Sequence, residues 1–182
     1  MFLVHKFLRR FGWEEPLSHI EVGQTAPEFS LKSLDGKEYS LAQLRKKGPV
    51  VVAFYKVSCP VCQFTFPFLQ RLAERYAGNS ASVVAVSQDD AHSTEGFNHE
   101  YGVNFLTLLD GRGYPVSNAY GLTSVPTIFL VAPDGKVKVS GTGFSKSDLE
   151  TIAAELAEQQ KTSSAPVAFF RPDEVVPAFK PG

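Results

Sequence analysis

The chain has 182 residues, of which 43% are hydrophobic and 20% charged, and its formal net charge is −1. This composition is typical of one globular domain with extensions, and a chain of this length can bury an ordinary core without disulfide bonds. A net charge near zero argues against a nucleic-acid partner, and no stretch approaches the roughly 18 apolar residues that a membrane-spanning helix needs.

Residues 1–19 are predicted to be an extension that precedes the domain. The opening MFLVHKFLRRFGW has positive charge inside its apolar stretch and no small-residue cleavage site, so it is a poor secretory signal. We therefore expect a cytoplasmic protein, with a periplasmic or envelope location as the alternative. The same stretch has the pattern of a short basic amphipathic helix that can contact a membrane surface, but an extension that docks on the domain or stays mobile is the favoured interpretation.

Residues 20–160 are predicted to form the domain, and their first half alternates strands with helices. Gly, Pro and Ser residues bound these elements, and runs that are apolar throughout are expected to be strands buried on both faces. The predicted elements are a hairpin over 29–41 around an Asp-Gly turn, a short helix over 41–45, a strand over 50–55, a helix over 63–76 and a strand over 82–87.

The second half of the domain continues this alternation and ends in a hairpin and a helix. The predicted elements are a helix over 89–101, a strand over 105–109, a short helix over 115–120, a hairpin of 127–132 with 136–140, and a helix over 147–160. This order predicts an α/β fold, with a mixed central sheet and helices on both of its faces.

Polar residues are expected to mark the starts of two helices. Asp89 and Asp90 open a predicted helix, where the helix dipole favours acidic side chains, and this explains them better than a catalytic pair of carboxylates does. Ser147 and Glu150 have the spacing of a capping box at the start of the last helix.

The last segment, residues 161–182, begins with a predicted linker over 161–165 and is rich in proline and phenylalanine. It is too apolar for a free tail. We expect it to pack back on the domain.

Cys59 and Cys62 are the only cysteines in the sequence, and they lie between a predicted buried strand and a predicted helix. The N–H groups and the dipole at a helix start favour negative charge, so they stabilise a thiolate there. Cys62 lies one helical turn later, where it can attack a mixed disulfide on Cys59. The position therefore predicts a redox couple in which Cys59 attacks and Cys62 resolves.

A metal site and an inert buried pair are the two simpler interpretations of these cysteines. A structural zinc site typically needs four ligands, and the sequence has no second cysteine pair, while His92 and His99 lie far along the chain. Free cysteines are often buried, but the position between strand and helix favours chemistry over packing. No metal and no organic cofactor are expected.

The residues around the pair resemble the active-site unit of the thioredoxin-like superfamily. Cys59-Pro60-Val61-Cys62 is similar to its paired-cysteine motif, Pro67 matches the proline that kinks its active-site helix, and residues 123–129 resemble the loop that carries its cis-proline. The resemblance implies that Pro126 packs beside the reactive disulfide and that Val125 bonds to the substrate backbone. Pro60, Val61, Val125 and Pro126 are thus the candidate substrate-binding residues.

The resemblance covers roughly residues 20–160. Within the superfamily, these residues are most similar to the redoxin branch, which includes the alkyl hydroperoxide reductase and thiol-specific antioxidant type. Residues 22–29, the hairpin after them and residues 110–121 carry this similarity. It implies a thioredoxin fold with an amino-terminal β-hairpin extension.

Three positions depart from the thioredoxin pattern. Ser58 replaces the tryptophan before the first cysteine, and Ala53 replaces the buried acid, so no proton acceptor is assigned for Cys62. Lys56 precedes Cys59 by three residues, where it either favours the thiolate electrostatically or extends to solvent.

Two other functions remain as alternatives to a thiol–disulfide oxidoreductase. In a peroxiredoxin-like thiol peroxidase Cys62 would react with peroxide, but Cys59 and Tyr55 stand where that family has threonine and proline. A redox-inactive binding module would have vestigial cysteines. The oxidoreductase is preferred, with a protein or small-molecule disulfide as substrate and a separate electron donor or acceptor.

Overall fold

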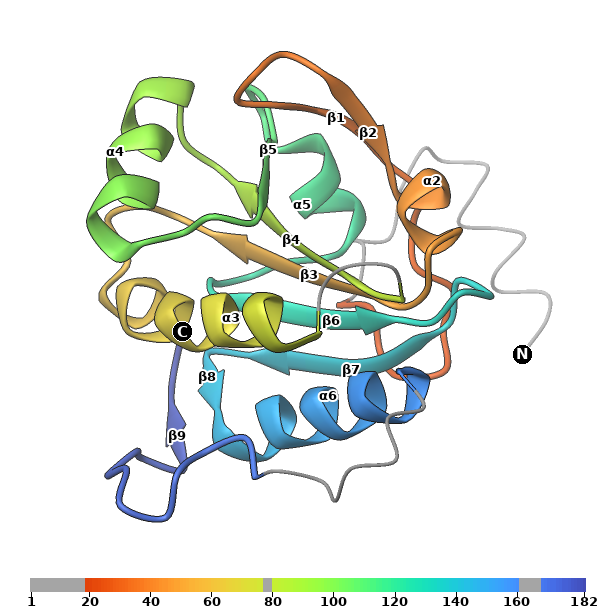
Figure 1. The fold of residues 1–182 in the computed structure, drawn as a ribbon. Helices are drawn as coiled ribbons and strands as arrows, with labels where there is room; N and C mark the ends of the chain where they lie inside the picture. Colours follow the sequence, from red (N-terminus) through yellow and green to blue (C-terminus); the bar gives the residue numbers. More distant parts are fainter. Residues whose placement is uncertain (1–18, 77–79, 161–167) are drawn as a thin grey trace, which may run out of the picture.

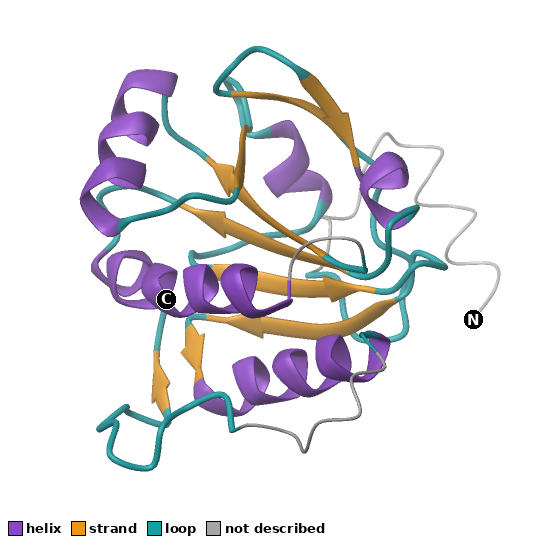
Figure 2. Cartoon of the chain, viewed as in Figure 1, coloured by secondary structure: helices purple, strands orange, loops and turns teal. Residues whose placement is uncertain are grey.

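The computed structural model describes residues 19–76, 80–160 and 168–182, and its core is a seven-stranded mixed sheet (Figures 1 and 2). The strand order is β2-β1-β5-β4-β3-β6-β7. β3, β4 and β5 are parallel, whereas β6 is antiparallel to β3 and β1 is antiparallel to β5. The strands are β1 Ser30–Ser33, β2 Glu38–Ser40, β3 Val50–Tyr55, β4 Ser82–Ser87, β5 Leu106–Leu109, β6 Thr127–Val131 and β7 Val137–Thr142.

Within the described residues, five helices pack on the two faces of the sheet, as the alternating pattern predicts. They are α2 Leu41–Arg45, α3 Pro60–Tyr76, α4 Ala91–Tyr101, α5 Pro115–Ala119 and α6 Lys146–Gln159. Successive side chains of a strand point to opposite faces, so Val51 and Ala53 of β3 pack with α3 and α6, while Val52 and Phe54 pack with α2. The predicted mixed sheet with helices on both faces is confirmed.

β3 lies inside the sheet, between β4 and β6, and it determines the position of the two cysteines. All six of its residues are buried, which fits its unbroken apolar sequence. Because β3 has a paired strand on each side, its end is fixed, and the chain that leaves Tyr55 enters α3 within a few residues.

Several helix starts differ from the sequence-based expectation. α3 begins at Pro60 rather than at residue 63, so Cys62 already lies inside the helix. The capping box predicted at Ser147 is wrong: α6 begins at Lys146, and the Ser145 side chain accepts a hydrogen bond from the Asp148 N–H. Ser145 has the extended backbone of a cap, because it still belongs to a short strand, whereas Ser147 is already helical.

Residues 168–182 pack against the body of the molecule, as their composition predicts. Phe169 and Phe170 are buried, and a short strand, β9 Phe179–Lys180, pairs antiparallel with β8 Phe144–Ser145. Figure 1 shows this pair beside α6, at the edge of the main sheet. The predicted extension over residues 1–19 lies outside the described residues, except for His19.

Among the described helices, none combines the length and apolarity needed to cross a membrane. The described part of the chain likewise contains no cluster of three or more His, Cys, Asp or Glu side chains that could hold a metal ion.

Candidate active site

Cys59 stands at the junction between β3 and α3, directly before the first residue of the helix. Its sulfur lies 3.2 Å from the backbone N–H of Cys62, which donates to it, and its carbonyl accepts the N–H of Gln63 at 3.0 Å. The Cys59 sulfur thus accepts a hydrogen bond from one of the free N–H groups at the start of α3, a contact that favours negative charge on the sulfur. Cys59 is half-buried and both cysteines are free thiols.

Cys62 lies inside the first turn of α3 and is fully buried. Burial, which disfavours the charged thiolate, raises the pKa of the Cys62 thiol, and its hydrogen bond with Cys59 raises the pKa further. The two cysteines therefore differ in kind, because one sulfur is reachable and near a helix N–H while the other is enclosed and held as a thiol.

The loop before β6 brings a third group to the pair. The Val125–Pro126 peptide bond is cis, in agreement with the resemblance to thioredoxin-like proteins. The Cys59 thiol donates a hydrogen bond to the Val125 carbonyl at 3.3 Å, although the two residues are 66 positions apart. Pro126 is buried behind this contact and Val125 is half-buried. The structure thus brings together Cys59, Cys62 and Val125.

The short loop before Cys59 is held by side chains from two other elements. The Asp89 carboxylate accepts the Val57 N–H at 2.8 Å, and the Gln63 side chain donates to the Val57 carbonyl at 3.0 Å. The Cys59 N–H bonds to the Lys56 carbonyl at 3.2 Å. These bonds fix the backbone that presents the Cys59 sulfur.

The sequence-based prediction that Asp89 and Asp90 both mark the start of α4 is wrong for Asp89. Only Asp90 caps that helix, through the Ser93 N–H at 2.9 Å. The available signal was the parallel pairing of β3 with β4, in which Tyr55 lies opposite Ser87. Residues just after these two strands meet at one edge of the sheet, which places Asp89 beside the cysteine loop.

Lys56 extends beside the site toward the α5 side. Its ammonium lies 5.2 Å from the centre of the Tyr114 ring, an arrangement typical of a cation–π contact. Lys56, Tyr114 and Val125 line a cavity of about 340 Å³ together with Gln88, Ser117, Asn118, Leu122, Thr123 and Ser124. The lysine is therefore near the cis-proline loop, and its effect on Cys59 stays a prediction.

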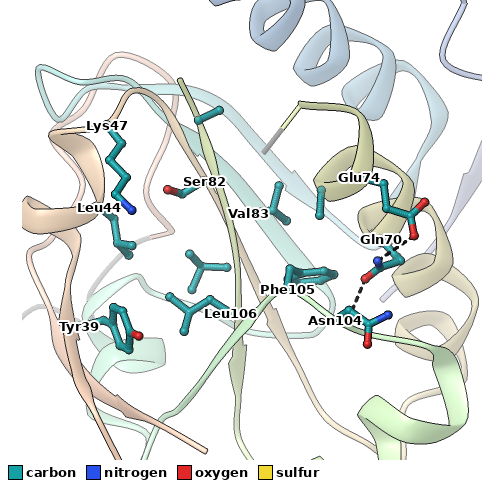
Figure 3. Close-up of a pocket in the computed structure, with 13 residues that line it drawn as sticks. Tyr39, Leu44, Lys47, Gln70, Glu74, Ser82, Val83, Asn104, Phe105 and Leu106 are labelled. Carbon is teal, nitrogen blue, oxygen red and sulfur yellow. Dashed lines mark hydrogen bonds between the residues drawn. The ribbon is translucent and has the colours of Figure 1, made fainter. Parts of the chain in front are cut away.

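A larger cavity, of about 510 Å³, lies elsewhere on the molecule (Figure 3). Its lining includes Ser82, the first residue of β4, and Gln70, which bonds to the Asn104 N–H at 2.8 Å and to Glu74 at 2.9 Å. Ser82 is at the opposite end of β4 from the edge that carries Cys59. No cysteine lines this cavity, so its size does not make it the reactive site.

Comparison with known proteins agrees with this geometry. The model of the AhpC/TSA family matches residues 22–140. The thiol-disulfide oxidoreductase ResA of Geobacillus thermodenitrificans is 35% identical over 133 residues, which cover 72% of this chain and 75% of that protein. ResA of Bacillus subtilis strain 168 is 34% identical over 134 residues, with coverage of 73% and 72%.

A solved structure has the same architecture. The crystal structure of a putative thiol:disulfide interchange protein DsbE from Chlorobium tepidum superposes with a TM-score of 0.68 and 26% identity. The match covers 77% of this chain and 98% of that one.

Proposed function

The chain belongs to the AhpC/TSA family and is a thiol–disulfide oxidoreductase, and on this premise we propose that Cys59 is its attacking cysteine and Cys62 its resolving cysteine. One observation carries the assignment. The half-buried Cys59 sulfur lies 3.2 Å from the Cys62 N–H and 3.3 Å from the Val125 carbonyl, whereas Cys62 is fully enclosed.

In the reducing direction the reaction has two exchange steps. The Cys59 thiolate attacks a substrate disulfide, forms a mixed disulfide and releases one substrate thiolate. Cys62 then loses its proton and attacks the Cys59 sulfur, so that the second substrate thiolate leaves and takes up a proton. The substrate gains two electrons and two protons, and the protein ends with a Cys59–Cys62 disulfide.

Protein disulfides are the substrate class that the family implies. We propose that their backbone contacts Val125 and Pro126, together with the exposed Pro60 and the half-buried Val61. An electron donor or acceptor must restore the starting state of the couple. Whether the cycle runs toward reduction or oxidation depends on the relative reduction potentials.

The experiment that tests these roles uses the small disulfide DTNB, which releases coloured thionitrobenzoate. The unchanged protein should release two equivalents, one for each exchange step. Cys62→Ser should release one equivalent and remain a mixed disulfide, while Cys59→Ser should react slowly through its enclosed thiol. Rapid release by Cys59→Ser, at the rate of the unchanged protein, would reverse the assignment.

The peroxidase and binding-module alternatives are not favoured. The cysteine that a peroxidase would use, Cys62, has no exposed surface. The relatives described above are thiol–disulfide oxidoreductases, and the Cys59 sulfur of this chain lies 3.2 Å from the backbone N–H of Cys62.

We also propose that the protein is located in the periplasm or envelope. The relatives give the cytoplasmic expectation no support. Protein disulfides form and persist in oxidising compartments, so the substrate class favours the periplasm or envelope. Fractionation of cells that carry the full gene would test this, and recovery of the protein with the cytosol would contradict it.

A further inference from the structure

Residues 168–182 lie outside the region that the family model matches, and Figure 1 shows β9 leading from this segment to α3, where the chain ends. Their firmest anchor is Glu174, whose two carboxylate oxygens accept hydrogen bonds from the two terminal nitrogens of Arg71 at 2.8 and 2.7 Å. Arg75, one turn later, donates to the Ala168 carbonyl at 3.2 Å. α3 therefore carries the cysteines at its start and the anchor of this segment farther along.

Aromatic packing holds the first part of the segment. Phe170 is 5% exposed, and its ring centre lies 5.4 Å from that of Phe68 and 6.4 Å from that of Phe144. Phe68 belongs to α3, and Phe144 belongs to β8. The segment thus packs on α3, the helix that begins directly after Cys59, and on β8.

The last five residues continue from there as an added strand. The Lys146 N–H donates to the Ala178 carbonyl at 2.9 Å, and β9 pairs with β8. The Lys180 ammonium lies 4.8 Å from the centre of the Phe64 ring, which is in the first half of α3. At Gly143, where φ is +80°, a Cβ would overlap the Lys180 carbonyl, so the two backbones are in close contact.

Residue 182 reaches the carbonyl that Cys59 contacts. A Cβ built on Gly182 would stand 2.9 Å from the Val125 oxygen, the atom to which the Cys59 thiol donates. When a substrate cysteine forms a disulfide with Cys59, its Cα must lie within about 7 Å of the Cys59 Cα, because disulfide geometry limits this distance. The backbone of a polypeptide substrate must therefore pass close to Val125, beside residues 178–182.

We propose that residues 178–182 occupy the edge along which a polypeptide substrate approaches Cys59, and so determine which disulfides are reduced. The inference rests on the proposed function. A small disulfide can reach the half-buried Cys59 directly, whereas an extended polypeptide must displace the added strand or pair in its place. The segment selects for small disulfides and for polypeptides that compete with it.

Loosening the anchor tests this selection. Glu174→Ala removes both bonds to Arg71, and Asp173→Ala, at an exposed neighbour in the same segment, is the matched control. We expect Glu174→Ala to raise kcat/KM for insulin reduction by roughly threefold or more, since the open state becomes more populated. The rate with DTNB should stay unchanged, and Asp173→Ala should resemble the unchanged protein with both substrates.

A second pair of variants displaces the strand directly. Gly143→Ala puts a Cβ against Lys180, while Gly36→Ala places alanine at the same φ of +80° with no atom within 4 Å, so it controls for backbone strain. Hydrogen exchange at residues 178–180 reports displacement. Faster hydrogen exchange in Gly143→Ala without faster insulin reduction would overturn the proposal. Hydrogen exchange that stays unchanged at residues 178–180 in both Glu174→Ala and Gly143→Ala would also overturn it.

One readout separates this proposal from the proposed function. Alkylation of Cys59 needs no disulfide exchange. In Glu174→Ala the rate with a maleimide on a large polyethylene glycol chain should rise, and the rate with iodoacetamide should not. If the alkylation rates behave in this way but the unchanged protein releases only one equivalent of thionitrobenzoate from DTNB, the cover exists and the assignment of Cys59 and Cys62 as a redox couple fails. Equal changes with both reagents would refute the cover itself.

Discussion

The sulfur of Cys59 has two hydrogen-bond partners of opposite kind. The Cys62 N–H, 3.2 Å away, donates to the sulfur, whereas the Val125 carbonyl, 3.3 Å away, accepts a hydrogen bond from the thiol. Ionisation therefore removes the contact with Val125. An incoming substrate can then approach a thiolate whose remaining hydrogen bond comes from the start of α3.

The enclosed state of Cys62 gives the second exchange step a defined pH dependence. Because burial raises the pKa of Cys62, the reactive thiolate is a minor form at neutral pH, and its fraction increases as pH rises. In the DTNB reaction, the rate of the second release should rise by about tenfold per pH unit between pH 6 and 8. Stopped-flow absorbance measures it, and a second phase that is independent of pH would contradict the raised pKa.

Asp89 is expected to act as a positioning residue for the cysteine loop. Asp89→Ala removes the acceptor of the Val57 N–H, so the rate of the first DTNB exchange should fall by roughly tenfold as Cys59 loses its fixed position. The adjacent Asp90→Ala removes a helix cap without touching this loop, and should lower the stability of the fold but not the exchange rate. A similar fall in rate for both variants would indicate that Asp89 has only a structural role.

At the scale of elements, two variants at the start of α6 test whether Ser145 or Ser147 caps this helix. Ser145→Ala removes the side chain that accepts the Asp148 N–H and should lower the free energy of unfolding by about 1 kcal/mol. Ser147→Ala should change it by less than about 0.5 kcal/mol. Chemical denaturation of the two variants measures the difference, and a larger loss for Ser147→Ala would restore the capping box that we reject.

Local patterns predicted the elements of the central domain well, because each of them has a complete signal in its own residues. The apolar run over 50–55 and the helical spacing over 63–76 need no distant partner to be recognised. β8 and β9 have two residues each and have no periodicity to detect. They exist because segments about 35 positions apart pair with each other, which only the folded chain shows.

At the scale of the whole molecule, the candidate site was partly predictable for the same reason. The position of the cysteines between strand and helix is local, and their chemistry follows from it. The cis Val125–Pro126 bond was expected from a family resemblance. The bond between Asp89 and Val57 depends on strand register, and the contact of Gly182 with Val125 depends on the packing of the whole segment along α3.

The arrangement of the molecule concentrates its chemistry at one edge. The carboxyl ends of β3 and β4, the cis-proline loop before β6 and the last residues of the chain meet there, while the larger cavity of Figure 3 includes the other end of β4. Residues from four separate parts of the sequence thus meet at the edge of the sheet that carries Cys59.

The central claim is that Cys59 and Cys62 form one reversible dithiol–disulfide couple. Equilibration of the protein in glutathione buffers of increasing oxidising strength, followed by acid quenching and peptide mass spectrometry, tests it most directly. The account predicts a single two-electron transition in which a peptide linking Cys59 to Cys62 replaces the two free thiols. Two thiols that stay free across the whole range, or a glutathione adduct on Cys59 that accumulates without the internal disulfide, would contradict it.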